Sequence, residues 1–257
     1  MNVRYNEGYK LESFERMRIE KRYTDGSYLQ KNPGWDREDS PWKVEQVNAI
    51  LRKFDIKPKT ICEIGCGTGD NLLHIGNEFV FSQLFGFDIS PQLASFWREN
   101  IKSNSLKNRL KFYLGDFHVL NKKKYDLILM LDVFEHVRDP FTFLEKSLTF
   151  AKYFVFHIPL DLSVLAVLRN TPLLSVREKV GHLHYYTKDL ALETLKDSGY
   201  EILHWNYTQA SLSSPNRSLK TKMMSIPRKI FYWIHKDFGV RLLGGETLIV
   251  LAKAKNS

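Results

Sequence analysis

The chain has 257 residues, of which 43% are hydrophobic, and its formal net charge at pH 7 is +9. This length and composition are sufficient to bury the core of one α/β domain with added segments. A membrane-spanning segment is not expected, because the longest apolar candidate, residues 154–168, is interrupted by His157, Pro159 and Asp161. The excess of positive charge favours a negatively charged partner, either a nucleic acid or an anionic membrane or glycolipid surface.

The first part of the chain is predicted to form a helical arm. Residues 1–38 are polar and partly helical in pattern, with one apolar face made of Leu11, Phe14, Met17 and Tyr23. A better helix is predicted to begin at Ser40-Pro41, since proline is tolerated in a first helical turn. Its buried stripe would consist of Val47, Ile50, Leu51 and Phe54. The first seven residues lack the apolar core of a secretory signal, so we expect a cytoplasmic location.

A glycine-rich turn follows the first predicted strand. The apolar run 60–62 leads into Glu63-Ile64-Gly65-Cys66-Gly67-Thr68-Gly69, and a helix is predicted over 71–75. A strand, a glycine turn and a helix in this order present backbone N–H groups to a nucleotide-like ligand. Glu63 would repel a pyrophosphate but could hold the ammonium group of an amino-acid cofactor through a water molecule. The motif therefore favours S-adenosylmethionine (SAM) over NAD.

Acidic residues follow the next three predicted strands. The run 84–88 ends in Asp88, about 20 residues beyond the glycines, where a carboxylate can accept both hydrogens of a ribose diol. The run 110–114 is followed by Asp116, which could accept from an adenine amine while Phe117 covers the ring. The run 125–131 reads as a fully buried strand, and residues 132–137 follow it.

The second half of the chain is predicted to complete the sheet. Strands are expected over 153–158, 200–207 and 246–252, with a helix over 187–198 that Gly199 ends. Between them lies a basic stretch, 217–241, whose apolar residues recur at helical spacing: Met223, Ile226, Ile230, Trp233 and Ile234. Such a helix can cover the acceptor site or lie on an anionic membrane surface. The cysteines, Cys62 and Cys66, are expected to be small buried residues without a disulfide.

Taken together, these motifs resemble the class I SAM-dependent methyltransferases over about residues 60–253. The resemblance implies a Rossmann-like, doubly wound α/β fold with a seven-stranded, mostly parallel sheet whose last strand is antiparallel. It also implies SAM as cofactor and S-adenosyl-L-homocysteine (SAH) as product. The chain would consist of a helical arm or cap over 1–58 and a SAM-binding domain over 59–257. Two insertions on the acceptor side are expected in that domain, at about 159–186 and 208–245. The cofactor-binding residues would be Glu63, Gly65, Cys66, Gly67, Gly69, Asp88, Ile89, Asp116, Phe117, Leu131, Asp132, Val133 and His136.

Three further strings resemble a bacterial subgroup without a known substrate. They are Asp39-Ser40-Pro41-Trp42-Lys43, residues 157–163 and residues 181–187.

Histidines are the candidates for activating an acceptor, because a hydroxyl or ammonium acceptor must lose a proton. His182 and His184 are two residues apart on a stretch expected to be extended, which would point both side chains to one face. His157 is expected to end the fifth strand at the active-site edge, and Asp161 is close enough in sequence to orient an imidazole. No metal site is expected, since the spacing of these four residues matches no short ligand motif.

The preferred acceptor is a small molecule, a sugar or a glycolipid precursor, methylated at oxygen or nitrogen. The insertions are large enough to enclose such a molecule, and ring-stacking side chains are available in Tyr185, Tyr186, Trp205 and Tyr207. The residues after the fourth strand, 131–134, lack the N/D-P-P-Y/F string expected of an amino-methylating nucleic-acid enzyme, although the charge leaves another RNA methylation open. A non-catalytic SAM-binding regulator is the remaining alternative.

Overall fold

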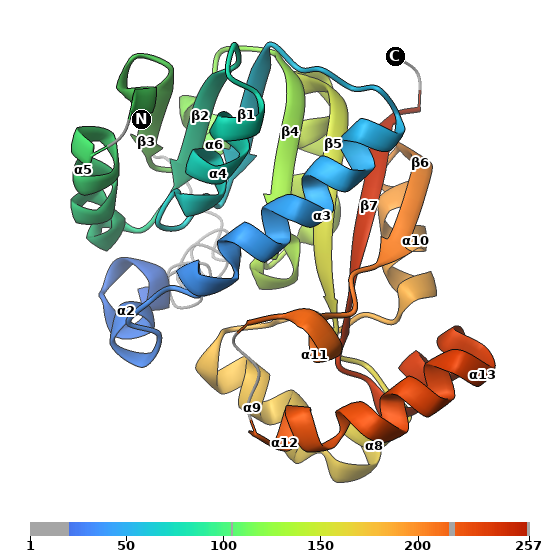
Figure 1. The fold of residues 1–257 in the computed structure, drawn as a ribbon. Helices are drawn as coiled ribbons and strands as arrows, with labels where there is room; N and C mark the ends of the chain where they lie inside the picture. Colours follow the sequence, from blue (N-terminus) through green and yellow to red (C-terminus); the bar gives the residue numbers. More distant parts are fainter. Residues whose placement is uncertain (1–20, 104, 216–218, 256–257) are drawn as a thin grey trace, which may run out of the picture.

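A seven-stranded sheet with the strand order β3-β2-β1-β4-β5-β7-β6 forms the centre of the molecule (Figure 1). The structure is a computed structural model that describes residues 21–103, 105–215 and 219–255. Strand β7 is antiparallel to both β5 and β6, whereas β1 to β5 pair in parallel. The strands are β1 Thr60–Ile64, β2 Gln83–Asp88, β3 Leu110–Leu114, β4 Tyr125–Leu131, β5 Ala151–Leu160, β6 Tyr200–Tyr207 and β7 Glu246–Ala254.

The predicted fold class is confirmed, and each predicted strand is present within a few residues of its expected ends. The strand order reverses between β1 and β4, which lie side by side near the middle of the sheet. In open α/β sheets, ligands bind beyond the carboxyl ends of the strands at such a reversal. The glycine turn after β1 and the loop after β4 therefore meet at the expected binding edge.

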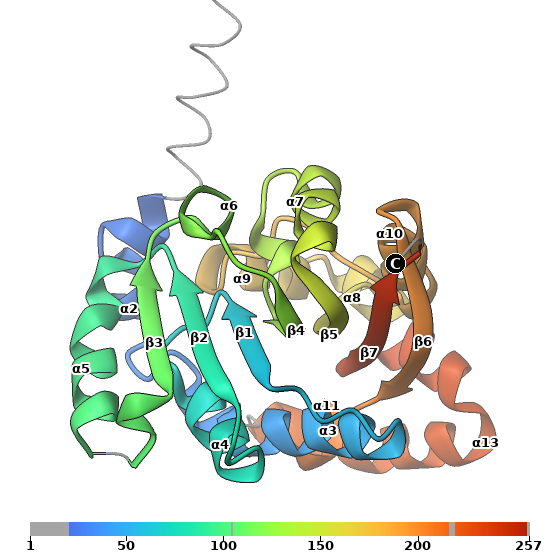
Figure 2. The ribbon, with the colours of Figure 1, turned by 90° about the horizontal axis from the view of Figure 1, so that it is seen from above.

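Helices cover both faces of the sheet and produce two hydrophobic cores (Figure 2). On one face lie α3 Ser40–Lys53, α4 Asp70–Glu78 and α5 Ala94–Ser103; on the other lie α6 Phe117–Leu120, α7 Pro140–Ser147 and α10 Lys188–Asp197. Strand β4 shows the cause, because Leu127 and Leu129 enter the first core while Ile128 and Met130 enter the second. A strand buried on both sides is apolar throughout, which made β4 predictable.

The arm is described from residue 21 onward and contains α2 Ser27–Lys31. The predicted apolar residues Leu11, Phe14 and Met17 lie outside the described residues. In α3, Val47, Ile50 and Leu51 are buried as predicted, but Phe54 is 39% exposed because it follows the last helical residue. Short 3₁₀ helices join the larger elements: η1 Arg37–Asp39, η2 Pro91–Leu93, η3 Ser105–Asn108, η4 Phe134–His136 and η5 Leu148–Phe150.

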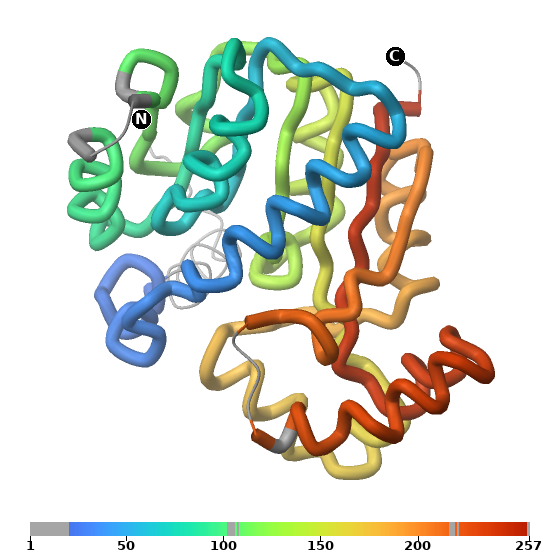
Figure 3. The backbone as a smooth tube through the Cα atoms, viewed as in Figure 1, coloured from blue at the N-terminus to red at the C-terminus, as the bar shows by residue number. Residues whose placement is uncertain are grey.

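The insertions after β5 and β6 form a group of helices beyond the carboxyl ends of the parallel strands (Figures 1 and 3). The first contains α8 Val164–Arg169 and α9 Thr171–Lys179; the second contains α11 Ala210–Ser213, α12 Leu219–Met223 and α13 Ser225–Leu243. Helix α8 contacts α13, so segments distant in sequence lie side by side. The predicted basic helix is thus present, with a kink at His235. Within the described residues, no helix combines the length and apolar character that crossing a membrane requires.

Candidate active site

The glycine turn after β1 has a backbone that only glycine adopts easily. Gly65, Gly67 and Gly69 have φ values of 70°, 51° and 84°. A Cβ on Gly65 would lie 2.9 Å from Cγ2 of Val133, and one on Gly69 would lie 2.4 Å from Cζ of Phe112. The turn is therefore held close to the loop after β4 and to β3.

The carboxylate of Asp88 fixes this turn from β2. Its Oδ2 accepts a hydrogen bond from the N–H of Gly67 at 2.9 Å, and its Oδ1 accepts from the N–H of Ser90 at 3.0 Å. Burial raises the pKa of Asp88, although these hydrogen bonds oppose the rise. The same side chain lines a cavity, so it can support the loop and face a ligand.

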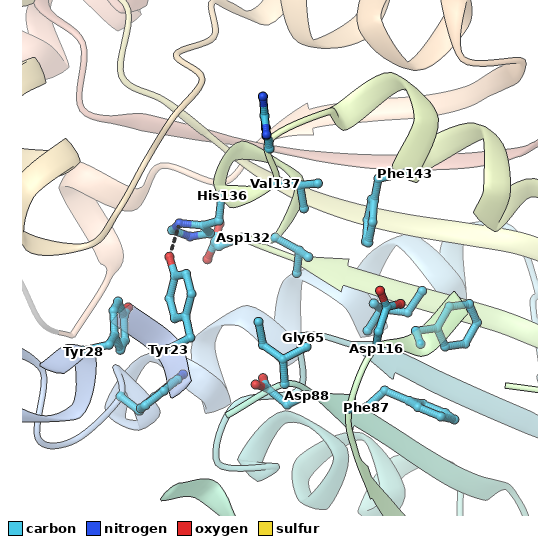
Figure 4. Close-up of a pocket in the computed structure, with 17 residues that line it drawn as sticks. Tyr23, Tyr28, Gly65, Phe87, Asp88, Asp116, Asp132, His136, Val137 and Phe143 are labelled. Carbon is cyan, nitrogen blue, oxygen red and sulfur yellow. Dashed lines mark hydrogen bonds between the residues drawn. The ribbon is translucent and has the colours of Figure 1, made fainter. Parts of the chain in front are cut away.

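The first cavity has a volume of about 220 Å³ and an aromatic and apolar wall (Figure 4). Of the predicted cofactor residues, it is lined by Gly65, Asp88, Ile89, Asp116, Phe117, Asp132, Val133 and His136. Asp116 also begins α6, since its Oδ1 accepts from the N–H of His118 at 2.8 Å. The structure thus gathers residues from β1, β2, β3 and β4 around one space, as a nucleoside site at a strand reversal requires.

Three aromatic residues of the arm close this cavity from the other side. Tyr23, Tyr28 and Trp35 line it, and their rings pack in sequence, with centroids 5.1 Å apart for the first pair and 4.5 Å for the second. The hydroxyl of Tyr23 is 3.0 Å from Nδ1 of His136 (Figure 4). Sequence reasoning placed Tyr23 on the arm's apolar face but gave none of these residues a place in the site.

A second cavity of about 360 Å³ adjoins the first and shares five wall residues with it: Tyr28, Trp35, Gly65, Asp132 and His136. Predicted residues that line only the second cavity are Cys66, Gly67, Leu131, His157 and His182. Its wall is more polar, with Asp36, Asp39, Asp70 and Lys43 among its residues. A second molecule therefore has room beside the first cavity.

Glu63 and Gly69 line neither cavity. The Glu63 side chain is fully buried, and its Oε1 accepts from Nδ2 of Asn71 at 2.8 Å. Burial raises the pKa of Glu63 to about 8. Asn71 itself lines the second cavity, so Glu63 is hydrogen-bonded to a wall residue of that cavity. The water-mediated contact of Glu63 with an ammonium group stays a prediction.

Asp132 joins three elements through an ion-pair network. Its Oδ2 lies 2.7 Å from Nζ of Lys43, and its Oδ1 lies 2.7 Å from Nδ1 of His157. Burial alone would raise the pKa of Asp132, but His157 and Lys43 hold it well below its usual range. The other nitrogen of His157, Nε2, lies 2.9 Å from Oγ1 of Thr247. Because both ring nitrogens are engaged, His157 supports Asp132 and is poorly placed to act as a base.

His182 is the predicted acceptor-side histidine that reaches the second cavity. Its Nδ1 lies 2.5 Å from Oδ2 of Asp161, so Asp161 orients His182 and not His157. Burial lowers the pKa of His182, but the hydrogen bond to Asp161 and the charge of Glu135 raise it on balance. His184 instead lies 2.9 Å, through Nε2, from the carbonyl oxygen of Val137 and lines neither cavity. The predicted common face of His182 and His184 is therefore absent.

Glu135 connects the loop after β4 to the first insertion. Its carbonyl oxygen accepts from the N–H groups of Leu183 and His184, at 2.8 and 3.1 Å. Its side chain is fully buried, and burial raises its pKa to about 8. The neighbouring His136 has its pKa lowered to about 3, chiefly by burial. Neither Glu135 nor Lys43 was assigned a role from the sequence, although both stand in strings that the sequence analysis quoted.

Comparison with known proteins supports the methyltransferase resemblance. A family described as a methyltransferase domain matches residues 41–205, more than half of the chain. Norajmaline N-methyltransferase from Rauvolfia serpentina is 30% identical over 97 residues, which cover 37% of this chain and 33% of that protein. The release factor glutamine methyltransferase of Fusobacterium nucleatum is 27% identical over 221 residues, covering 85% and 53%. The chain thus spans about a third to a half of the length of these curated relatives.

Solved structures agree on the fold. Magnesium protoporphyrin IX methyltransferase from Synechocystis PCC 6803, with bound SAH, superposes with a TM-score of 0.56 at 15% identity and covers 82% of each chain. A putative sarcosine dimethylglycine methyltransferase from Galdieria sulphuraria gives a TM-score of 0.58 at 15% identity, covering 83% of this chain and 86% of that one. With the matched domain and the sheet order, these likenesses show that the chain belongs to the class I SAM-dependent methyltransferase family.

Proposed function

We propose that this protein transfers a methyl group from SAM to an oxygen or nitrogen atom of a small molecule, a sugar or a glycolipid precursor. The observation that carries the proposal is the pair of adjoining cavities, which share Gly65, Asp132 and His136 in their walls. Methyl transfer requires two molecules to be held with their reacting atoms close together, and two connected spaces at one sheet edge provide that arrangement.

The first cavity is the proposed site of the nucleoside part of SAM. Asp88 would accept from the ribose hydroxyls, and Asp116 would accept from the adenine amine beside Phe117. Gly65 also lines this cavity, and because it has no Cβ, which would lie 2.9 Å from Cγ2 of Val133, the turn can pack against the loop after β4 at the edge of the cavity. When bound, SAM supplies a methyl group on a positively charged sulfur, which keeps the bonding electron pair as the methyl leaves.

The second cavity is the proposed acceptor site, and His182 is the proposed acceptor-activating residue. Its Nδ1 is held by Asp161, which leaves its Nε2 side toward the remaining groups of the site. The acids of this wall, Asp36, Asp39 and Asp70, suit an acceptor rich in hydroxyl or amino groups, because carboxylates accept hydrogen bonds from both.

We further propose that α12 and α13 contact an anionic lipid surface and bring a lipid-linked acceptor to this edge. Met223, Ile226 and Trp233 are 78%, 69% and 88% exposed, which is unusual for large apolar side chains in one helical pair. Lys222, Lys229 and Lys236 lie in the same stretch and supply the positive charge such a surface attracts. The cytoplasmic location expected from the sequence also remains a prediction.

A transfer assay tests the methyltransferase proposal. The protein is incubated with methyl-labelled SAM and with separate fractions of lipids, saccharides, small metabolites and RNA, and the labelled product is isolated. Labelling in a small-molecule, saccharide or lipid fraction supports the proposal, and labelling confined to RNA overturns it. Tight SAM binding without transfer to any fraction would instead favour a SAM-binding regulator.

Flotation with vesicles tests the surface of α12 and α13. The protein should float with vesicles that contain anionic lipid and should remain in the lower fractions with neutral vesicles. Replacing Trp233 and Ile226 by Ser should abolish flotation and leave SAM affinity unchanged, because neither side chain lines either cavity. Equal flotation with both kinds of vesicle, or flotation unaffected by the substitutions, would contradict this part of the proposal.

A further inference from the structure

Three side chains with metal-ligand atoms converge beside the second cavity. They are Glu135, His136 and His182, and their ligand atoms all lie within 4.8 Å of one another. Two of them, His136 and His182, also line the second cavity, and their ring centroids are 4.8 Å apart. The cluster joins the loop after β4 to the first insertion, so it forms only in the folded chain.

The Glu135 carboxylate has no hydrogen-bond partner in this environment. Its side chain is fully buried, and both Oε1 and Oε2 are without a donor. Taking a carboxylate out of water without a compensating partner is costly, and buried charges are as a rule paired or coordinated to a metal. Nε2 of His136 is 3.7 Å from Oε1 of Glu135, too far for a hydrogen bond. A cation between these groups would satisfy the carboxylate.

Both histidines have a polar partner at Nδ1. Nδ1 of His182 lies 2.5 Å from Oδ2 of Asp161, and Nδ1 of His136 lies 3.0 Å from the hydroxyl of Tyr23. A metal-bound histidine ordinarily has its second nitrogen held by a carboxylate, a carbonyl or another polar group, which fixes the ring and its tautomer. In His136, Nε2 is the nitrogen that lies toward Glu135, 3.7 Å from its Oε1, and in His182, Nε2 is the nitrogen that Asp161 does not hold.

We propose that Glu135, His136 and His182 bind one divalent transition-metal ion at the wall of the acceptor cavity. Two histidines and one carboxylate are the ligand set of catalytic zinc sites and of non-haem iron(II) sites, both of which keep a coordination position open. From the sequence, a different set of four residues was considered: His157, Asp161, His182 and His184. In the structure, His157 and His184 have other partners, and Asp161 holds Nδ1 of His182.

The proposal deepens the proposed function and rests on it for one consequence, the nature of the acceptor. A metal ion would lower the pKa of an acceptor hydroxyl bound at its open coordination position, and the proton of that hydroxyl would pass to water. With Nδ1 held by Asp161 and Nε2 on the metal, His182 would activate the acceptor through the metal and not by taking the proton itself. The acceptor oxygen forms the new bond to the methyl carbon as the carbon–sulfur bond breaks, and sulfur retains that electron pair. A hydroxyl is therefore the acceptor group that this site favours, since an amine bound to the metal would have its lone pair occupied.

Metal titration of the full-length protein tests the site directly. The protein is treated with a chelator, dialysed, and titrated with Co²⁺ and Zn²⁺ while the visible absorption of Co²⁺ and the heat of binding are recorded. We expect one ion per chain, at least about 100-fold weaker binding in Glu135→Gln, and 10- to 100-fold weaker binding in Asp161→Asn. His74→Gln, which alters an exposed histidine of α4, is the matched control and should bind as the parent does.

Outcomes separate this inference from the proposed function. Failure of the parent protein to bind either ion, or binding that is equal in Glu135→Gln, overturns the metal site. If Glu135→Gln does not fold, as judged by thermal unfolding, His136→Asn replaces it and must show the same loss. Metal binding without methyl transfer to any acceptor leaves the metal site standing and overturns the proposed function. Methyl transfer at an equal rate with and without metal leaves the proposed function standing and overturns the role of the metal in activating the acceptor.

Discussion

Replacing Glu63 by Gln should make the SAM-free protein more stable at neutral and alkaline pH. Gln is close in shape to Glu, and its Oε1 can still accept from Nδ2 of Asn71. Burial raises the pKa of Glu63 from 4.5 to about 8. The charged groups around it are Lys43, which opposes the rise, and Asp88 and Asp70, which add to it.

The sign of the effect follows from proton linkage. A carboxyl whose folded-state pKa is raised contributes fully to stability below the unfolded pKa, near 4.5, and loses that contribution as pH rises through about 8. At pH 7 the folded state keeps the proton while the unfolded state does not. The cost is about 1.4 kcal/mol for each pH unit above 4.5, or about 3 kcal/mol at pH 7. Gln does not ionise and escapes this cost.

Denaturant unfolding at pH 5 and pH 8 measures the effect. The free energy of unfolding of Glu63→Gln should exceed that of the parent by several kcal/mol at pH 8, on the order of 3 or more, and by less than about 1 kcal/mol at pH 5. The control is Glu78→Gln in α4, where Glu78 forms an exposed ion pair with Arg52 and should matter by about 1 kcal/mol or less at both pH values. An advantage of Glu63→Gln that is the same at pH 5 and pH 8 would refute the reasoning.

Three other predictions concern the site. Asp88→Ala should weaken SAM binding by about 10- to 150-fold in calorimetry, from the loss of a charged acceptor worth roughly 1.5–3 kcal/mol; unchanged affinity in a folded variant would remove Asp88 from the site. His182→Asn should lower turnover by about 10²- to 10⁴-fold with SAM affinity intact, while His74→Asn should do neither; normal turnover in His182→Asn would exclude it as the activating residue. Gly69→Ala should lower the melting temperature, because its Cβ would lie 2.4 Å from Cζ of Phe112; an unchanged melting temperature would show that the Phe112 ring gives way without cost.

The sheet was predictable because its signals are local. Each strand is a short apolar run, and the acids and glycines that follow the strands mark the binding edge, which is why Asp88, Ile89, Asp116 and Val133 all line a cavity. Whether such a residue lies at the binding edge depends on its position relative to the end of its own strand. No long-range pairing has to be known.

The partners of the histidines were not predictable on the same basis. Strand β5 continues to Leu160, so Asp161 lies just beyond its end, near the start of the first insertion. His182 lies near the end of that insertion, and the two side chains contact each other only because the insertion folds back. The ion pair between Lys43 and Asp132 likewise joins a helix before the sheet to a loop in its middle. Such contacts depend on how separate elements pack, and a single sequence carries no periodicity that records them.

The first cavity is built from two structurally distinct parts of the chain. Gly65, Asp88 and Asp116 belong to the stretch that the methyltransferase family shares, whereas Tyr23, Tyr28 and Trp35 precede residue 41, where that match begins. Tyr23 and Tyr28 belong to neither hydrophobic core. Trp35, by contrast, packs against the core beneath α3, α4 and α5. Substitutions of Tyr23 and Tyr28 can therefore reshape the wall of the first cavity without disturbing the folding of the sheet. As related proteins diverge, the preference of this cavity for its ligand and the stability of the sheet could therefore change independently.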